Sequence, residues 1–137
     1  MGFSILARCA RTGQIGLAMA SDTVAVGRTC DGALRPGAGG SITQGDPNPR
    51  NNRFATSLLA QGARPAHVLR ELIASDPQSA LRQIAVIDRA GEIAVHEGGE
   101  LQAVVAHQVG DGYAVLGAAL ASEGVVAAMA GRFTSDP

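Results

Sequence analysis

The side chains that could do chemistry in this sequence lie beside its predicted strands. Ser4 and Ser21 occupy strand positions near a chain end or a turn, where a hydroxyl can face a pocket. A hydroxyl becomes a nucleophile when a nearby base removes its proton. Other polar residues flank strand ends in the same way: Asp22, Thr43, Gln44, Asp46, Arg82 and Asp88. This pattern predicts a polar pocket at strand ends, although Ser4 fits equally well as an ordinary alternating strand residue.

Metal and nucleotide chemistry have no matching motif. His67, His96 and His107 lie far apart in different predicted elements, and no HxH or HExxH spacing joins them. Gly37–Ser41 reads GAGGS, which lacks the GxxxxGK[ST] pattern and is interpreted as a tight bend where backbones approach closely. No GxSxG nucleophile elbow occurs. We therefore predict neither a metal ion nor a cofactor.

The composition excludes two classes of function. All 11 basic residues are arginine and the formal net charge is −1. Without lysine, a Schiff-base mechanism is excluded. The arginines are scattered and aromatic residues make up only 3% of the chain, so the basic stripe and stacking rings of a nucleic-acid-binding protein are both missing.

The two cysteines and the apolar segments bear on location. Cys9 and Cys30 form no CxxC pair and are interpreted as free, buried thiols rather than as a disulfide. The N-terminus lacks a secretion-signal pattern, and no apolar run reaches about 18 residues. These features predict a cytoplasmic protein with no membrane partner.

Alternating apolar residues predict hairpins. Phe3–Cys9 places alternate side chains on opposite faces and turns at Gly13 into the returning strand Ile15–Ala20. Later strands are predicted at Ser41–Gln44, Arg82–Asp88, Glu92–His96 and Tyr113–Ala118. Residues 21–40 are predicted to be largely irregular because of their glycines, with Val24–Gly27 interpreted as a short strand or turn.

Helices are predicted in the middle and at the end of the chain. The predicted ranges are Arg53–Gln61, Pro65 to about Asp76, and Ser122 to about Arg132. Gly45–Asn52 is predicted to hold no regular structure. Because strands and helices are grouped rather than alternating, the order indicates one α+β domain over residues 1–137, with antiparallel sheet and helices packed outside.

Several segments together resemble a known family. They are FSILARC, AMASDTVAVG, GAGGSITQ, LLAQG, LRQIAVID and VGDGYAVLGAALAS. Their order and spacing resemble the family called domain of unknown function 1028, from residue 3 to about residue 133. That family is placed in the N-terminal nucleophile hydrolase superfamily. The resemblance therefore implies a four-layer αββα sandwich and an amidohydrolase acting on a small amide or peptide-like substrate.

The amidohydrolase hypothesis assigns roles to the polar residues. Enzymes of that superfamily use the side chain of the first mature residue as nucleophile and its free α-amine as base. The catalytic candidates here are Ser4 and Ser21, and the substrate-binding candidates are Asp22, Gln44 and Asp46.

A second hypothesis is a catalytically silent module that binds a small molecule or assembles. Members of the family typically carry Thr after the initiator Met, where this chain has Gly2, which offers neither hydroxyl nor thiol. An Ala- and Val-rich surface with few charges would suit a homo-oligomer or a companion chain. Since relatives continue with another helix and strand, a third interpretation is a processed subunit or a piece of a longer protein.

Overall fold

The computed structural model describes residues 2–102 and 104–135, which form two antiparallel four-stranded sheets and three α-helices. The first sheet has the order β2 (Ile15–Ser21), β1 (Gly2–Arg8), β8 (Tyr113–Ala118), β7 (Ala106–Gly110). The second has the order β3 (Cys30–Arg35), β4 (Gly39–Gly45), β5 (Arg82–Asp88), β6 (Ile93–Glu97).

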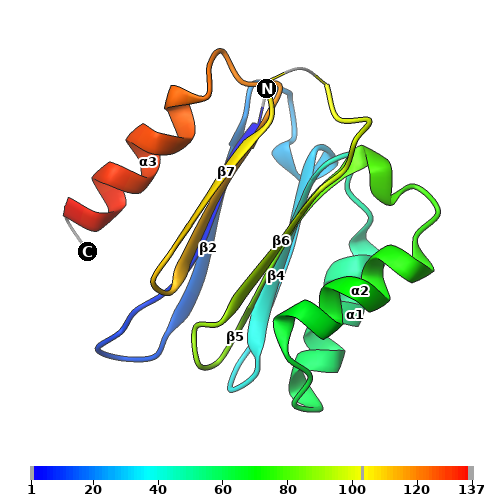
Figure 1. Ribbon diagram of the computed structural model, residues 1–137, viewed down its shortest axis with the longest axis vertical. Helices are drawn as coiled ribbons and strands as arrows, with labels where there is room; N and C mark the ends of the chain where they lie inside the picture. The colour runs from blue at the N-terminus through cyan, green and yellow to red at the C-terminus, as the bar shows by residue number, and fades with distance from the viewer. Residues whose placement is uncertain (1, 103, 136–137) are drawn as a thin grey trace.

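The helices lie on the outer faces of the two sheets (Figure 1). Their bounds are α1 (Pro49–Ala60), α2 (Pro65–Ser75) and α3 (Gly124–Ser135). α3 covers the first sheet, whereas α1 and α2 cover the second, so the layers follow an α-β-β-α order. The predicted α+β class, with antiparallel sheets and helices outside, is confirmed. No helix among the described residues is long and apolar enough to cross a membrane.

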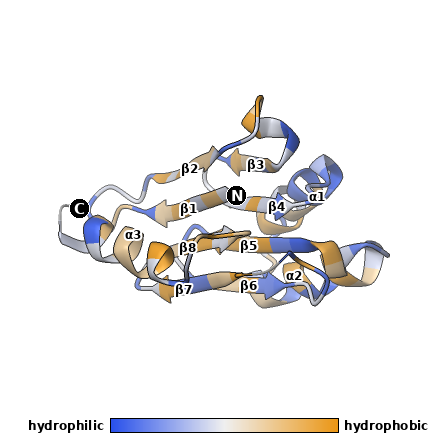
Figure 2. Ribbon diagram, turned by 90° about the horizontal axis from the view of Figure 1, so that it is seen from above, coloured by the Kyte–Doolittle hydropathy of each residue, from blue (hydrophilic) through white to orange (hydrophobic). Residues whose placement is uncertain are grey.

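Strand alternation explains how the sheets pack. On β1, Leu6 points toward the second sheet and is fully buried, while Phe3 and Ile5 pack against the layer that α3 covers. On β5, Ala85 faces the first sheet and Ile84 lies under α1 and α2. Apolar residues therefore fill three layers, one between the two sheets and one between each sheet and its helices, and orange segments mark apolar residues along the strands and helices in Figure 2. Each buried aliphatic side chain contributes roughly 1.5–3 kcal/mol of transfer free energy.

Both predicted hairpins, within residues 3–20 and 82–96, are confirmed. β1 and β2 pair around Gly13, whose φ of 73° is readily available to glycine. β5 and β6 pair around Gly91, and the predicted strand from Tyr113 is β8.

Two strands were not predicted. β3 pairs with β4, so the prediction that residues 21–40 are largely irregular is wrong. Within that range, Val26–Arg28 is a short 3₁₀ turn and not a strand. β7 was also missed, and it holds His107.

α2 matches its predicted range, whereas the boundaries of α1 and α3 differ from the sequence-based ones. The prediction that Gly45–Asn52 holds no regular structure is wrong, because α1 begins at Pro49. The Asn48 side chain accepts a hydrogen bond from the Arg50 amide and caps this first turn, with proline at its first position. At the other end of the chain, α3 begins at Gly124 and continues to Ser135.

The prediction that both cysteines are buried holds for Cys30 and is wrong for Cys9, which is exposed at the end of the first strand. Hydrogen bonding by the Thr12 hydroxyl, followed by backbone amides of the turn, lowers the pKa of the Cys9 thiol to about 7. Burial raises the pKa of the Cys30 thiol.

We expect iodoacetamide to alkylate Cys9 first. Because the thiolate is the reactive form, the rate should rise through about pH 7 and level off above it, whereas an ordinary thiol gains rate up to about pH 8.5. Peptide mass spectrometry over pH 5–9 would measure the profile. Thr12→Val should move it to higher pH, and an unchanged profile in that variant would contradict the assigned cause.

Candidate functional site

A cavity of about 340 Å³ opens between the two sheets at the end where β1 begins. The first sheet contributes Gly2, Ser21 and Ala118, and strand pairing sets Gly2 directly between the other two. The second sheet contributes Cys30 and Gln44, which pair across β3 and β4. The cavity is thus built by strand ends that are far apart in the sequence.

A hydrogen-bonded chain of side chains leads away from the cavity, buried at Ser4, Gln44 and Gln83 and exposed at Glu97 and His107. The Ser4 hydroxyl donates to Gln44 Oε1 at 2.6 Å, and Gln44 Nε2 donates to Gln83 Oε1 at 2.6 Å. Gln83 Nε2 then donates to Glu97 Oε1 at 2.9 Å, and the same oxygen lies 2.7 Å from His107 Nδ1. The chain joins both sheets and fixes the Gln44 amide at the cavity wall.

Three hydroxyls form a second polar group at the cavity. Ser21 Oγ lies 2.9 Å from Thr23 Oγ1 and accepts a hydrogen bond from Thr29 Oγ1 at 3.2 Å. The Thr29 hydroxyl also lies 3.2 Å from the Val26 carbonyl oxygen. All three residues line the cavity, and their hydroxyls bond to one another.

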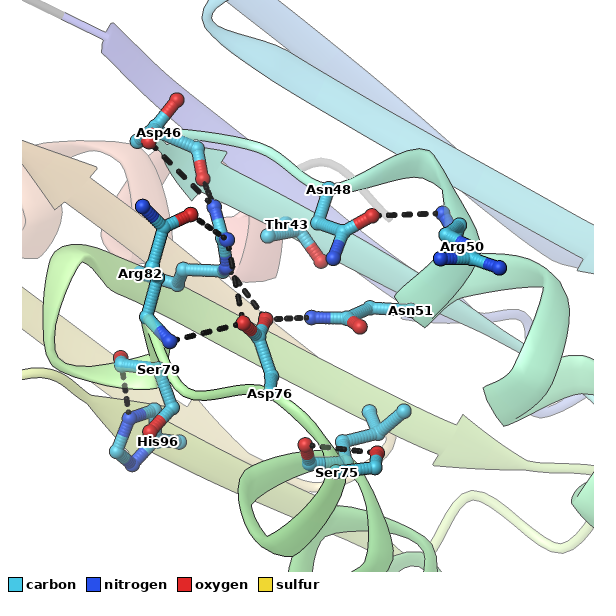
Figure 3. Close-up of polar contacts among 12 residues, drawn as sticks. Thr43, Asp46, Asn48, Arg50, Asn51, Ser75, Asp76, Ser79, Arg82 and His96 are labelled. Carbon is cyan, nitrogen blue, oxygen red and sulfur yellow. Dashed lines mark hydrogen bonds and ion pairs between the residues drawn. The ribbon is translucent and has the colours of Figure 1, made fainter.

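A buried ion pair holds the loops that border the cavity (Figure 3). Arg82 Nε donates to Asp76 Oδ2 at 2.5 Å, and both side chains are at most 4% exposed. Arg82 Nη1 also donates to the Asp46 carbonyl oxygen and lies 3.8 Å from the Asp46 carboxylate. Asn51 Nδ2 donates to Asp76 Oδ2 at 2.6 Å. These contacts tie the loop before α1 to the segment between α2 and β5.

The charge of Asp76 follows from these partners. The Arg82 guanidinium, followed by the Asn51 amide, lowers the pKa of the Asp76 carboxyl to about 2 against the opposing effect of burial. Asp76 is therefore ionised at neutral pH and bonded on both oxygens, so the ion pair serves as a fixed strut.

The charges at the cavity itself are acidic. Asp46 and Glu100 line it, and no Arg or His lies among its described lining residues. Asp46 is 63% exposed and partly neutralised by Arg82, whereas Glu100 is an exposed residue of the loop after β6. Such a site disfavours anions and accepts neutral or cationic molecules.

The structure brings most of the predicted site residues together. Ser21, Gln44 and Asp46 line the cavity, and Ser4 lies one hydrogen bond behind it, 1% exposed and bonded to Gln44. Asp22 is exposed and is not among the residues that line the cavity. The catalytic and substrate-binding roles of these residues remain predictions.

The other polar residues at strand ends have structural partners. Thr43 Oγ1 donates to Asn52 Oδ1 under α1, and Asp88 Oδ1 accepts from the Ala90 and Glu92 amides in the β5–β6 turn. Within the described residues, no group of three or more His, Cys, Asp or Glu side chains is placed to hold a metal ion.

Several cavity residues were missed by sequence reasoning, among them Thr23, Thr29, Cys30 and Glu100. Cys30 was interpreted only as a buried thiol because β3 was not recognised, and its pairing with Gln44 places it at the cavity. Glu100 lies in a loop that carries no recognisable motif. Gly32 interrupts the alternation along residues 30–35, so no sequence signal placed Cys30 at the cavity, and none placed Glu100.

Comparison with known proteins gives a family and a structural relative. No curated protein matches the chain significantly. The crystal structure of protein SPO2555 from Silicibacter pomeroyi, described as belonging to DUF1028, superposes with a TM-score of 0.89 at 30% sequence identity. The match covers 98% of this chain and 62% of that one. The family model "Family of unknown function (DUF1028)" matches residues 2–137. The chain therefore belongs to the family of unknown function DUF1028.

Proposed function

We propose that the cavity at the start of β1 binds a small amide and hydrolyses it. One observation carries this proposal: the Gly2 backbone lines the same cavity as hydroxyl, thiol and amide side chains from both sheets. A cleft with a few convergent polar groups is the usual form of a small-molecule site. The layer order agrees with the N-terminal nucleophile hydrolase-like arrangement that the sequence resemblance implies.

The same resemblance suggests a base. Removal of Met1 would free the α-amine of Gly2, and this residue lines the cavity. An amine at the edge of a partly apolar cavity can accept a proton during acyl transfer. The Gln44 amide, held by Ser4 and Gln83, would orient the substrate by hydrogen bonding.

The two acidic residues at the cavity, Asp46 and Glu100, favour some substrates over others. With Asp46 and Glu100 at the cavity and no basic lining side chain among the described residues, we expect neutral or amine-bearing amides to be preferred over amides that carry a carboxylate. A cavity of about 340 Å³ fits a molecule of roughly metabolite size, at the lower end for ligand sites.

The experiment is a hydrolysis panel of small linear and cyclic amides in neutral, amine-bearing and carboxylate-bearing versions, with the released amine measured. The wild type should hydrolyse at least one neutral or cationic member. Glu100→Gln should reduce the preference for the cationic over the carboxylate-bearing version by about 3–10-fold at low salt. Glu71→Gln, an exposed change on α2 outside the cavity, is the matched control. Hydrolysis of no member would contradict the proposal.

A second candidate function is binding without turnover. The observation that favours it is Gly2, which lines the cavity but carries no hydroxyl or thiol. In that case an amide of the panel should raise the melting temperature saturably while no amine is released. Product formation with the same ligand would exclude this candidate.

A further inference from the structure

The Cys30 sulfur lies where a side chain of residue 2 would point. A Cβ placed on Gly2 would lie 3.4 Å from Cys30 Sγ and 3.7 Å from the Ala20 carbonyl oxygen. Gly2 faces the inter-sheet space, as do Ser4 and Leu6 along the same strand. The thiol from β3 thus occupies the part of the cavity that β1 leaves open at Gly2.

The polar surroundings leave this thiol as the best-placed nucleophile. The hydroxyls of Ser21, Thr23 and Thr29 bond to one another, and Ser4 is bonded to Gln44 behind the wall. Cys30 Sγ donates to Gln44 Oε1 over a long distance, 3.9 Å, and burial raises the pKa of its thiol against the smaller, lowering effect of a hydrogen bond with the Thr29 side chain. Sulfur is also intrinsically more nucleophilic than a hydroxyl once its proton is removed.

We propose that Cys30 is the nucleophile of this cavity, an inference that rests on the proposed amide hydrolysis. Its sulfur attacks the amide carbonyl carbon and forms a C–S bond. The C–N bond then breaks, and the thiol proton passes to the leaving amine, through the Gly2 α-amine once Met1 is removed. Water next attacks the thioester, the C–S bond breaks, and the carboxylic acid and the free thiol are released.

Burial determines the protonation state from which this cycle starts. Cys30 is 1% exposed, and desolvation raises the pKa of its thiol, so the resting group is protonated. Its proton must therefore leave as the C–S bond forms, which requires a base at the site. The exposed Cys9 lies at the far end of β1 and can be removed without touching the cavity.

The test uses the Cys9→Ser protein as the parent, because Cys30 is then its only cysteine. On an amide that the wild type hydrolyses, Cys30→Ala and Cys30→Ser should each lower kcat by about 100-fold or more and change KM by less than about 3-fold. Acid quenching during turnover, followed by peptide mass spectrometry, should find the acyl group on the Cys30 peptide of the parent. Cys30→Ser keeps a similar volume should Cys30→Ala fail to fold.

The outcomes separate this inference from the proposed function. If a folded Cys30 variant keeps full kcat, or if the acyl group is found on another residue, Cys30 is not the nucleophile. The proposed amide hydrolysis is unaffected by either result. If the wild type hydrolyses no amide of the panel, the proposed function is wrong, and so is the proposed role of Cys30 as its nucleophile. Loss of kcat together with an acyl-Cys30 adduct supports both.

Discussion

Replacing Arg82 with methionine is expected to lower the free energy of unfolding by about 3–5 kcal/mol. The change leaves the Asp76 carboxylate 3% exposed with no cation beside it, and it also removes the donor to the Asp46 carbonyl. Urea unfolding monitored by circular dichroism would measure the loss. Because the ion pair no longer holds the loops beside the cavity in place, ligand binding should weaken as well.

The control is an ion pair of similar geometry on the surface. Arg64 Nη2 lies 3.0 Å from Glu92 Oε1, with side chains 78% and 38% exposed. Arg64→Met should cost less than about 1 kcal/mol, because exposed pairs gain little from charge attraction. Similar losses in the two variants would contradict the role assigned to burial.

Acid should weaken the same ion pair by protonating Asp76. The pKa of Asp76 is lowered to about 2, so its ion pair stabilises the fold fully above the ordinary carboxyl pKa near 3.8. Stability is then lost as pH falls from about 4 to about 2, because the unfolded chain binds the proton more readily. The contribution is about 2 kcal/mol. The Asp76→Asn variant should lose about 2 kcal/mol less free energy of unfolding over this pH range than the wild type does. Equal losses in the two proteins would contradict the assignment of this pH dependence to Asp76.

Replacing Gly39 with alanine is expected to cost at least about 3 kcal/mol or to prevent folding. Gly39 has a φ of 151°, and a Cβ there would lie 2.1 Å from the Ile87 carbonyl oxygen. The neighbour is backbone of β5, which cannot move aside as a flexible side chain can. Sequence reasoning predicted a close backbone approach in this glycine-rich segment, and the structure confirms it at this residue.

The matched control for Gly39 is Gly16 on β2. A Cβ at Gly16 meets nothing within 4 Å. Gly16→Ala should therefore change the free energy of unfolding by no more than about 0.5 kcal/mol. Thermal melts of the two variants beside the wild type would decide, and a Gly39 variant as stable as the Gly16 variant would contradict the packing argument.

The fold was predictable wherever one periodicity dominated. β1 and β2 alternate, β5 contains an apolar β-branched run, and short glycine turns join each hairpin, so local residues determine the hairpins. β3 was hidden because Gly32 interrupts its pattern and its edge position leaves it partly exposed. The first turn of α1 was hidden because buried Asn51 and Asn52 look like loop residues. Their burial depends on Asp76 and Ser41, which are distant in sequence.

The site was less predictable than the fold. Strand-end reasoning found Ser21, Gln44 and Asp46, because strand ends converge whichever way the sheets are ordered. It could not find Cys30, since the pairing of Cys30 with Gln44 depends on the register of β3. It also could not exclude Asp22, because the position of a residue beyond the end of a strand is set by the following turn.

Blocking the cavity tests the central claim most directly. Ala118 lines the cavity between the sheets, whereas Ala18 lies on the outer face of the first sheet. Amine release from the panel amides should be measured for Ala118→Leu, Ala18→Leu and the wild type, each with its melting curve. We expect Ala118→Leu to lose activity by about 10-fold or more while remaining folded, because the added carbons occupy substrate volume, and Ala18→Leu to match the wild type. Equal amine release by the wild type and a folded Ala118→Leu protein would contradict the assignment of function to this cavity.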